Sequence, residues 1–160
     1  MKYKELYFRI FNKKPKFFEY YIKKYIDVTF SANILIQKII NCKNKIYKKF
    51  LLRKLYYKYS ILIGVNTKIG NNFCIKHPLN IVIGEGCVIG DNVTIYHSVT
   101  LGQKKGKYPQ IKDNVLIYPN SVIVGGITIE NNSVIGANCF CDFDVKSNSV
   151  CASHRCVKIK

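Results

Sequence analysis

Two histidines, His77 and His97, have the residue type and spacing that could support catalysis in this 160-residue chain. A neutral imidazole can accept a proton near neutral pH, and a hydroxyl that loses its proton during attack becomes a better nucleophile. The two histidines lie twenty residues apart. If the chain returns to the same place after twenty residues, His77 is a candidate general base. His97 is then a candidate acceptor ligand or electrostatic partner, or simply a solvent-exposed corner residue.

The chain from residue 61 onward repeats with a period of six residues, and this repeat determines the predicted fold. Each unit has an anchor that is nearly always Ile or Leu, often followed by glycine. The period fits neither an α-helix nor an alternating strand, but it is typical of a parallel β-helix, whose anchors stack coil over coil. Thirteen units predict about four coils. The anchors are Ile63, Ile69, Ile75, Ile83, Ile89, Ile95, Leu101, Ile111, Ile117, Ile123, Ile129, Ile135 and Cys141.

The first interruption of the period brings the two histidines together. The step from Ile75 to Ile83 is eight residues instead of six, and the two extra residues fall at His77 and Pro78. Three units after Ile75 comes Ile95, so these two anchors should stack at the roughly 4.8 Å spacing of adjacent strands. We therefore expect the imidazole of His97 to lie beside that of His77.

The second interruption is a polar, basic loop. The step from Leu101 to Ile111 is ten residues, which inserts a loop at residues 103–108 (QKKGKY). Long loops on a regular scaffold often carry functional residues. This loop is therefore a second candidate functional segment.

Residues 1–60 differ sharply in composition from the repeat. They hold 16 of the 26 Lys and Arg against three carboxylates, a net charge of +13, and they contain no glycine. The pattern predicts helices over residues 3–12 and 16–27 and one long helix from a cap at Ser31 to about residue 57. Its apolar stripe would contain Ile36, Ile39, Ile40, Ile46, Tyr47 and Phe50. We thus expect a basic helical segment at 1–60 and a β-helix domain at 61–160.

Three roles are open for the helical segment. It could cap the β-helix, with lysines facing solvent, or its residues 1–58 could contact an anionic membrane surface. Nucleic-acid binding is the third, but the basic and aromatic residues match no recognised module, so we expect no nucleic-acid partner. Every apolar run is interrupted before the roughly 18 residues that a membrane span needs, and no secretory signal is visible. We expect a cytoplasmic protein, with peripheral contact at the inner face of the membrane as one option.

The cysteines do not indicate a metal centre. Seven cysteines occur, none in a C-x-x-C spacing. Buried free thiols are therefore expected, and no structural metal.

Several motifs in the repeat resemble those of a known family. Residues 77–83 (HPLNIVI), residues 89–102 (IGDNVTIYHSVTLG) and residues 109–111 (PQI) are similar to hexapeptide-repeat acyltransferases of the serine acetyltransferase type. The resemblance covers about residues 61–150. It implies a mainly β fold, a left-handed parallel β-helix, and a homotrimer with active sites between subunits. It also implies transfer of an acetyl group from acetyl-CoA to a hydroxyl on a small-molecule or glycan acceptor.

The resemblance also assigns roles to individual residues. His77 matches the family's catalytic base, and backbone amides near Gly102 are candidates for stabilising the oxyanion. Small corner residues and a C-terminal lysine are candidates for binding acetyl-CoA. These candidates are Gly102, Ser121, Gly136, Ala137 and Lys158. The candidate acceptor-binding residues are Lys76, His97, Lys107 and Tyr108.

Departures from the family pattern concern the acceptor. The family pairs its catalytic histidine with an aspartate, and the matching position here is Leu62. The family also has an aspartate directly before that histidine, where this chain has Lys76, whose charge would repel the ammonium of serine. The short basic helical segment resembles shorter relatives that acetylate sugars. We therefore expect a sugar or glycan precursor of surface polysaccharide as acceptor, with serine as the alternative and a noncatalytic scaffold as a third reading.

Overall fold

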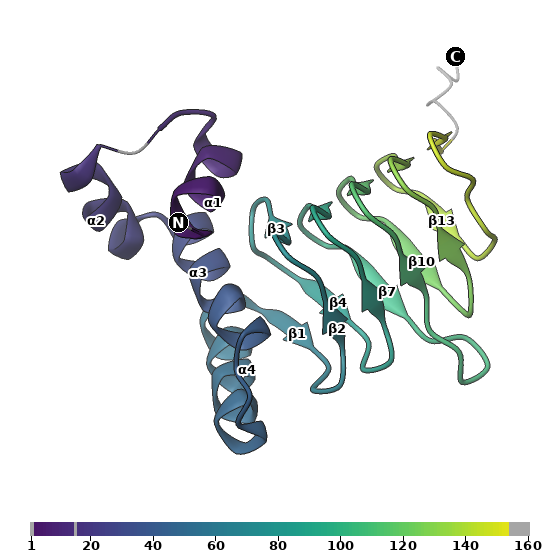
Figure 1. Cartoon of the computed structure of the whole chain (residues 1–160). Helices are drawn as coiled ribbons and strands as arrows, with labels where there is room; N and C mark the ends of the chain where they lie inside the picture. The colour runs from purple at the N-terminus through teal and green to yellow at the C-terminus, as the bar shows by residue number, and fades with distance from the viewer. Residues whose placement is uncertain (1, 15, 154–160) are drawn as a thin grey trace, which may run out of the picture.

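Four helices lead into a solenoid of short parallel strands in the computed structural model, which describes residues 2–14 and 16–153 (Figure 1). The helices are α1 (Lys2–Phe11), α2 (Phe17–Ile26), α3 (Val28–Ile40) and α4 (Lys45–Tyr59). The strands are β1 (Ile61–Ile63), β2 (Lys68–Ile69), β3 (Cys74–Ile75), β4 (Ile81–Ile83), β5 (Val88–Ile89), β6 (Thr94–Ile95), β7 (Thr100–Gly102), β8 (Gln110–Ile111), β9 (Leu116–Ile117), β10 (Val122–Val124), β11 (Thr128–Ile129), β12 (Val134–Ile135), β13 (Phe140–Cys141) and β14 (Val150–Cys151).

The strands form three parallel sheets, which confirms the β-helix predicted from the six-residue period. The sheet orders are β1-β4-β7-β10-β13, β2-β5-β8-β11 and β3-β6-β9-β12-β14. Each predicted anchor lies at or near the end of a strand, and the register pairs Ile75 with Ile95 as expected. The solenoid has one strand more than the thirteen predicted units, because β14 follows the last predicted anchor.

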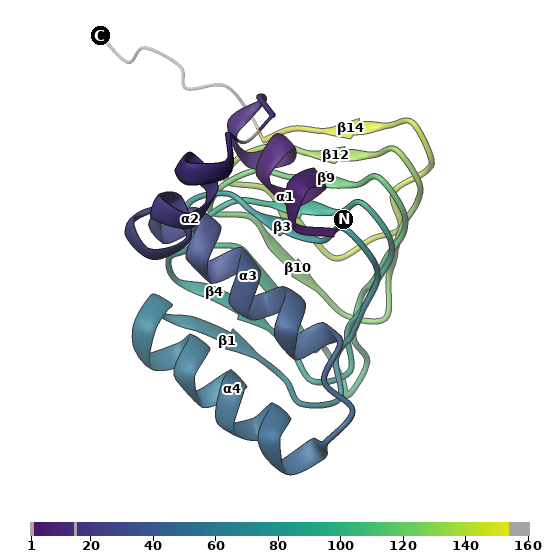
Figure 2. The same cartoon turned by 60° about the vertical axis from the view of Figure 1, so that its left-hand side comes forward.

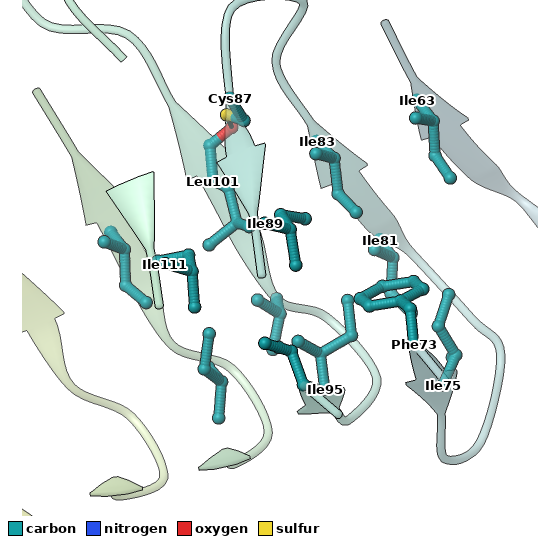
Figure 3. Packing of buried hydrophobic residues seen from close by; sticks show 14 of the residues in the cluster. Ile63, Phe73, Ile75, Ile81, Ile83, Cys87, Ile89, Ile95, Leu101 and Ile111 are labelled. Carbon is teal, nitrogen blue, oxygen red and sulfur yellow. Dashed lines mark hydrogen bonds between the residues drawn. The ribbon is translucent and has the colours of Figure 1, made fainter. Parts of the chain in front are cut away.

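The stacked anchors form the core of the solenoid (Figure 3). Ile75, Ile95 and Leu101 are completely buried, in one cluster with the anchors of neighbouring coils. Each strand is too short to be stable alone, so every coil depends on its neighbours for backbone hydrogen bonds and apolar contact. One such bond runs from the amide of Lys76 to the carbonyl oxygen of Ile95, at 2.8 Å.

Asparagine residues make one of the tight corners. Asn72, Asn92, Asn114 and Asn132 all have a positive φ between 54° and 59°, a left-handed conformation that asparagine tolerates better than most residues. Their carboxamides also bond along the solenoid, as from Asn114 Nδ2 to Asn132 Oδ1 at 3.1 Å. The sequence thus supplies a corner residue that both turns the chain and links the coils.

The predicted long helix from Ser31 to about residue 57 is wrong, because the chain divides it into α3 and α4. Helix α3 begins after Asp27, whose carboxylate accepts a hydrogen bond from the amide of Phe30 at 2.8 Å. Helix α4 begins after Asn44, whose side-chain oxygen accepts from the amides of Ile46 and Tyr47, both at 3.0 Å. Both side chains cap helices, and the cap at Asn44 falls inside the predicted helix and marks its interruption.

The break also changes which apolar residues are buried. Ile36 and Ile39 of α3 pack into the core, as predicted, but Ile46 and Phe50 of α4 are 82% and 64% exposed. Helix α4 instead turns a different face inward, on which Leu51, Leu55 and Tyr59 are buried. The predicted apolar stripe is therefore correct in α3 and wrong in α4.

Helix α3 covers the open end of the solenoid (Figure 2). Strand β3 has no preceding coil, and the side chain of Asn33 takes the place of one. Its Nδ2 donates to the carbonyl of Ile75 and its Oδ1 accepts from the amide of Ile75, both at 2.8 Å. Gln37 Nε2 donates to the carbonyl of Phe73 at 3.1 Å. The predicted role of the helices as a cap is thus confirmed for α3, and such a cap protects the free edge of β3.

The helices end at Tyr59 and the first strand begins at Ile61, but both parts share one hydrophobic core. Their division into separate domains at residue 60 stays a prediction. Across the part of the chain that the structure describes, every helix is too short or too polar to cross a membrane.

Candidate active site

His77 lies at the corner between β3 and β4, where the two extra residues of the repeat were predicted. Two residues of this corner, His77 and Asn80, have positive φ values of 56° and 52°. The equivalent corner between β6 and β7 has one such residue, Ser98, at 55°. A histidine in this conformation is uncommon, and its side chain is exposed to solvent. The insertion therefore opens the corner and presents an imidazole at the surface.

Two aromatic rings lie near the imidazole of His77, and a third ring stacks on one of them. The His77 centroid lies 6.0 Å from that of His97 and 6.1 Å from that of Tyr96. The ring of Tyr96 stacks on that of Tyr118, with centroids 5.2 Å apart and an angle of 13° between the planes. The predicted pairing of His77 and His97 is confirmed as a contact, although their roles stay predictions.

The two tyrosines were not among the predicted site residues, although the sequence contains a signal for their position. Tyr96 follows the anchor Ile95, and Tyr118 follows the anchor Ile117 one coil later. Residues directly after stacked anchors must themselves stack, so the register alone places the two rings together.

His97 carries a polar atom without a partner. Its Nδ1 is buried and forms no hydrogen bond with any of the described residues. Buried polar atoms are normally paired, so this one is an exception, and a bound molecule could reach it only if the side chain moved. The role of His97 in holding an acceptor stays a prediction.

The side chain of Lys76 binds the C-terminal end of helix α1. Its Nζ donates to the carbonyl oxygens of Arg9 at 2.6 Å and Ile10 at 3.0 Å, in the last turn of α1. A cation at the C-terminal end of a helix is favourable because unpaired carbonyls and the helix dipole gather negative charge there. The ammonium of Lys76 is thus engaged by α1, and its predicted place among the acceptor-binding residues stays a prediction.

Arg9 strengthens the same contact between α1 and the solenoid. Its guanidinium donates to the carbonyl oxygen of Asn72, to that of Asn92 at 3.0 Å, and to Oγ1 of Thr94 at 2.8 Å. Together with Lys76, it fixes α1 against the first two coils. Lys76, which is held by helix α1, therefore directly precedes His77 at this corner.

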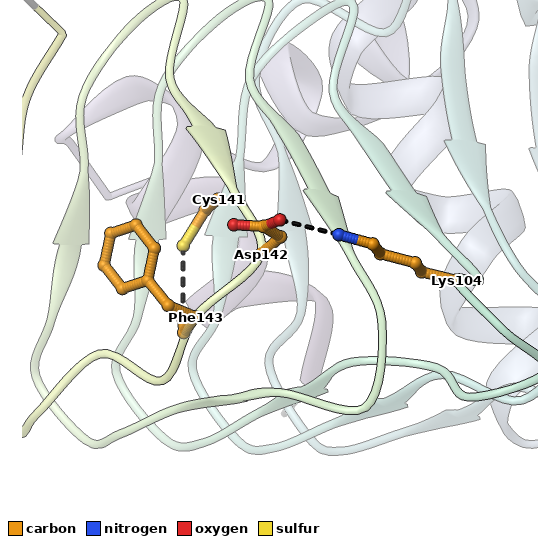
Figure 4. A network of polar contacts seen from close by, with 4 residues as sticks. All are labelled: Lys104, Cys141, Asp142 and Phe143. Atoms are coloured by element: carbon orange, nitrogen blue, oxygen red, sulfur yellow. Dashed lines mark hydrogen bonds and ion pairs between the residues drawn. The ribbon is translucent and has the colours of Figure 1, made fainter.

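The loop at residues 103–108 is an ordered hairpin rather than an open segment. Lys104 and Lys107 exchange backbone hydrogen bonds of 3.0 and 3.2 Å around a turn in which Lys105 and Gly106 have positive φ. The side chain of Lys104 forms an ion pair with Asp142 at 2.7 Å, while the thiol of Cys141 donates to a nearby carbonyl (Figure 4). The side chain of Lys107 is exposed to solvent and packs partly over Gly126.

Tyr108 packs on a different corner of the solenoid. Its ring occupies the space that a Cβ would need at Gly84 and Gly86, where ring atoms would lie 2.6 and 2.3 Å away. These glycines lie between β4 and β5, whereas His77 lies between β3 and β4. Within one chain, Lys107 and Tyr108 therefore belong to another corner than His77.

The candidate donor-binding residues fall into two groups. Ser121, Gly136 and Ala137 lie on the same corner column as His77 and His97, whereas Gly102 ends β7. The hydroxyl of Ser121 is buried and donates toward the carbonyls of Tyr118 and Gly136, at 2.9 and 2.8 Å, so it holds adjacent coils together. Its predicted contact with acetyl-CoA stays a prediction. Lys158 lies outside the described residues. No group of three or more metal-ligating side chains gathers in residues 2–14 and 16–153.

Comparisons with known proteins agree with this architecture. Residues 80–104 match the family described as "Hexapeptide repeat of succinyl-transferase", and residues 108–142 match "Bacterial transferase hexapeptide (six repeats)". The parallel β-helix with its opened histidine corner thus places this chain in the hexapeptide-repeat transferase family.

Within that family the chain is similar to serine acetyltransferases. It is 41% identical to that of Staphylococcus epidermidis and 40% identical to that of Staphylococcus aureus over 111 residues, 67% of this chain. The chain spans about half the length of these relatives, 52%.

Two solved structures show a similar fold. Serine acetyltransferase isoform 3 of Entamoeba histolytica, in complex with cysteine, superposes with a TM-score of 0.81 at 26% identity, over 99% of this chain and 60% of that one. The Neisseria gonorrhoeae enzyme in complex with serine gives 0.75 at 27% identity, over 91% of this chain and 62% of that one. The superposition on the Entamoeba protein includes the helices as well as the solenoid.

Proposed function

We propose that this protein is an acetyl-CoA-dependent O-acetyltransferase whose leading acceptor is serine. The observation that carries the proposal is the opened corner, where an exposed imidazole in a left-handed conformation lies beside His97 and Tyr96. Membership of the hexapeptide-repeat transferases and the names of the similar proteins support the acetyl transfer.

His77 is proposed as the general base. Its imidazole takes the proton of the acceptor hydroxyl while the hydroxyl oxygen bonds to the thioester carbonyl carbon. When the tetrahedral intermediate collapses, the carbon–sulfur bond breaks and the imidazolium returns its proton to the leaving sulfur. Backbone amides near Gly102 are the proposed oxyanion donors if the donor site is completed by a second subunit.

Within residues 2–14 and 16–153, no carboxylate binds this imidazole as in the family pattern. Leu62, at the matching position, is half exposed on β1, where it pairs with Val82. The neighbouring rings of His97 and Tyr96 are the groups that can restrict His77 instead. We infer that they act as positioning residues for the imidazole of His77.

The preference for serine over a glycan rests on two observations. The similar sequences and structures are serine acetyltransferases, and one of those structures contains serine. The engagement of the Lys76 ammonium by α1 carbonyls also weakens the charge argument against an ammonium-bearing acceptor. The acceptor expected as the alternative from the sequence is therefore the one that the comparisons favour.

A sugar hydroxyl is the second candidate, and one feature of the site favours it. The stacked rings of Tyr96 and Tyr118 form an apolar aromatic surface beside the base. Such a surface can pack against the carbon–hydrogen face of a sugar ring, whereas free serine has little apolar surface to place there.

The separation of the candidate residues supports a homotrimer. His77 and Tyr108 lie at different corners of one chain, so both can contact one acceptor only if they come from neighbouring subunits. We expect a particle of about 55 kDa in light scattering, three times the 18.5 kDa chain. A monomer that retains full activity would contradict this assembly.

The test of the reaction is release of the CoA thiol from acetyl-CoA in the presence of serine, of a neutral sugar or of an acidic sugar. We expect serine to give the highest kcat/KM. His77→Asn is the matched variant, because asparagine occupies left-handed corners elsewhere in this solenoid and should preserve the backbone. Its turnover should fall by about 10² to 10⁴. Wild-type turnover in this variant would remove His77 from the mechanism, and a glycan preferred over serine would select the second acceptor.

A further inference from the structure

The outer side of α4 combines apolar and basic side chains in a way that the catalytic proposal does not explain. We propose that it docks on the surface of an anionic phospholipid membrane. We call it the docking face, and it consists of Ile46, Tyr47, Phe50 and Tyr57 with the surrounding lysines of residues 43–58.

The apolar part of the docking face is unusually exposed. Ile46 is 82% exposed, Phe50 64% and Tyr57 71%. Positions 46, 50 and 57 share one side of a helix, because they are separated by four and seven residues. The opposite side of α4 already packs on the core through Leu51 and Leu55, so the exposed stripe is not needed for folding.

The basic part of the docking face is not neutralised. Residues 41–60 contain seven lysines and arginines and no carboxylate. In the described part of the chain, none of these cations forms an ion pair. Five lysines line a pocket of about 650 Å³ at the start of α4, together with Ile46 and with Glu85, which accepts a hydrogen bond from Asn66. These lysines are Lys43, Lys45, Lys48, Lys49 and Lys68.

The exposed apolar side chains and the unpaired lysines of the docking face together identify the binding partner. Lipid phosphates attract the lysines, and the layer just below them accepts aliphatic and aromatic side chains to a depth of about 5–10 Å. A nucleic acid would satisfy the lysines but leave Ile46 in water. A second copy of α4 would cover Ile46 and Phe50 but bring two strongly basic helices together. An anionic membrane is the partner that satisfies both parts.

The chain itself provides a clean reporter for this proposal, because it contains no tryptophan. Phe50→Trp places a single indole on the docking face, and Phe143→Trp places one at a similarly exposed site on the solenoid, 55% exposed. With vesicles that contain phosphatidylglycerol and phosphatidylcholine at about 1:3, we expect a blue shift of the indole emission in the Phe50→Trp variant and none in the Phe143→Trp variant. Vesicles of phosphatidylcholine alone should give no shift. A shift of both reporters, or of neither, would overturn the proposal.

Charge removal provides the second arm of the experiment. We expect Lys45→Gln with Lys49→Gln to lower the vesicle partition coefficient about 25-fold, since each basic residue near an anionic surface contributes about a factor of five. Lys146→Gln, which removes an exposed lysine of the solenoid, is the matched control and should change it less than twofold. Equal loss in both variants would show attraction by net charge alone and contradict a defined docking face.

Single-stranded RNA and light scattering distinguish the other partners. RNA could displace the vesicles and bind the Phe50→Trp variant without a blue shift of the indole emission. That result would assign the surface to nucleic acid. Self-association that Phe50→Ser abolishes, without vesicle binding, would assign it to a second copy. Acetyl transfer measured without vesicles should be unchanged in all these variants, so failure of the docking proposal is distinguishable from failure of the proposed enzyme activity.

Discussion

Replacing Lys76 by methionine distinguishes the two roles that this residue could have beside the catalytic corner. In the structure its ammonium is bound by the carbonyls of Arg9 and Ile10. Lys76→Met preserves the length and much of the apolar stem of the side chain but removes these two hydrogen bonds. We expect α1 to detach more often, while the catalytic corner retains its shape.

The size of the effect follows from the contacts. Hydrogen bonds to a charged donor contribute about 1.5–3 kcal/mol each, and a cation at a helix C-terminus about 0.3–1 kcal/mol. Because the side chain of Lys76 is only partly buried, water competes for the ammonium, and we expect a loss of about 2 kcal/mol in the docking free energy of α1. This corresponds to an increase of about thirtyfold in the undocked population.

Amide hydrogen exchange measures this population. Backbone amides in α1 should exchange up to about thirtyfold faster in Lys76→Met, whereas those of β9 should be unchanged. Lys112→Met is the matched control, since Lys112 is also partly exposed and its backbone amide bonds to Ile129 across the coils. It should leave exchange in α1 unaltered.

Steady-state kinetics give the result that would refute this reasoning. If Lys76 is engaged by α1, the KM for serine should change less than twofold in Lys76→Met. A lysine that faced the acceptor would place like charges about 4 Å apart, at a cost of about 1 kcal/mol in water-like surroundings and more in a partly desolvated cleft. A tenfold fall in KM, with unchanged exchange in α1, would therefore place Lys76 at the acceptor.

Three further outcomes test the packing of the solenoid. Gly86→Ala should displace the Tyr108 ring, which lies 2.3 Å from the added Cβ, lower the free energy of unfolding by about 1–3 kcal/mol and raise the KM for the acceptor. Ile95→Ala should lower the free energy of unfolding by about 2–5 kcal/mol in urea titrations, because its side chain is fully buried. Burial raises the pKa of the Cys87 thiol to about 11, so iodoacetamide at about pH 8 should label the partly exposed Cys42 and spare Cys87 until the protein unfolds.

The sequence was sufficient to predict the solenoid because its information is local and repeated. Between the two interruptions the anchors recur every six residues. A wrongly assigned anchor would therefore have displaced every later anchor of the same block. The pairing of Ile75 with Ile95, and with it the contact of His77 and His97, followed from counting alone. The same counting could have found Tyr96, which was missed because no rule for acetyl transfer asks for an aromatic ring there.

The helical segment was harder to predict because its determining contacts are distant in sequence. The bond from Lys76 to Arg9 joins residues 67 positions apart, and the bond between Asn33 and Ile75 spans 42. The break between α3 and α4, by contrast, had a local signal in the cap at Asn44. The long apolar stripe concealed it, since isoleucines on both sides of the break fit one helical period.

These distant contacts converge on the strand that positions the base. The later strands of its sheet pair with the coil before them, but β3 is the first strand of that sheet. Asn33 of α3 binds the amide and carbonyl of Ile75, and α1 holds the ammonium of Lys76. His77 is the next residue, so two helices stabilise the strand end from which the imidazole projects. The helical segment therefore acts on the proposed chemistry without touching a substrate, because it replaces the missing coil beneath the catalytic corner.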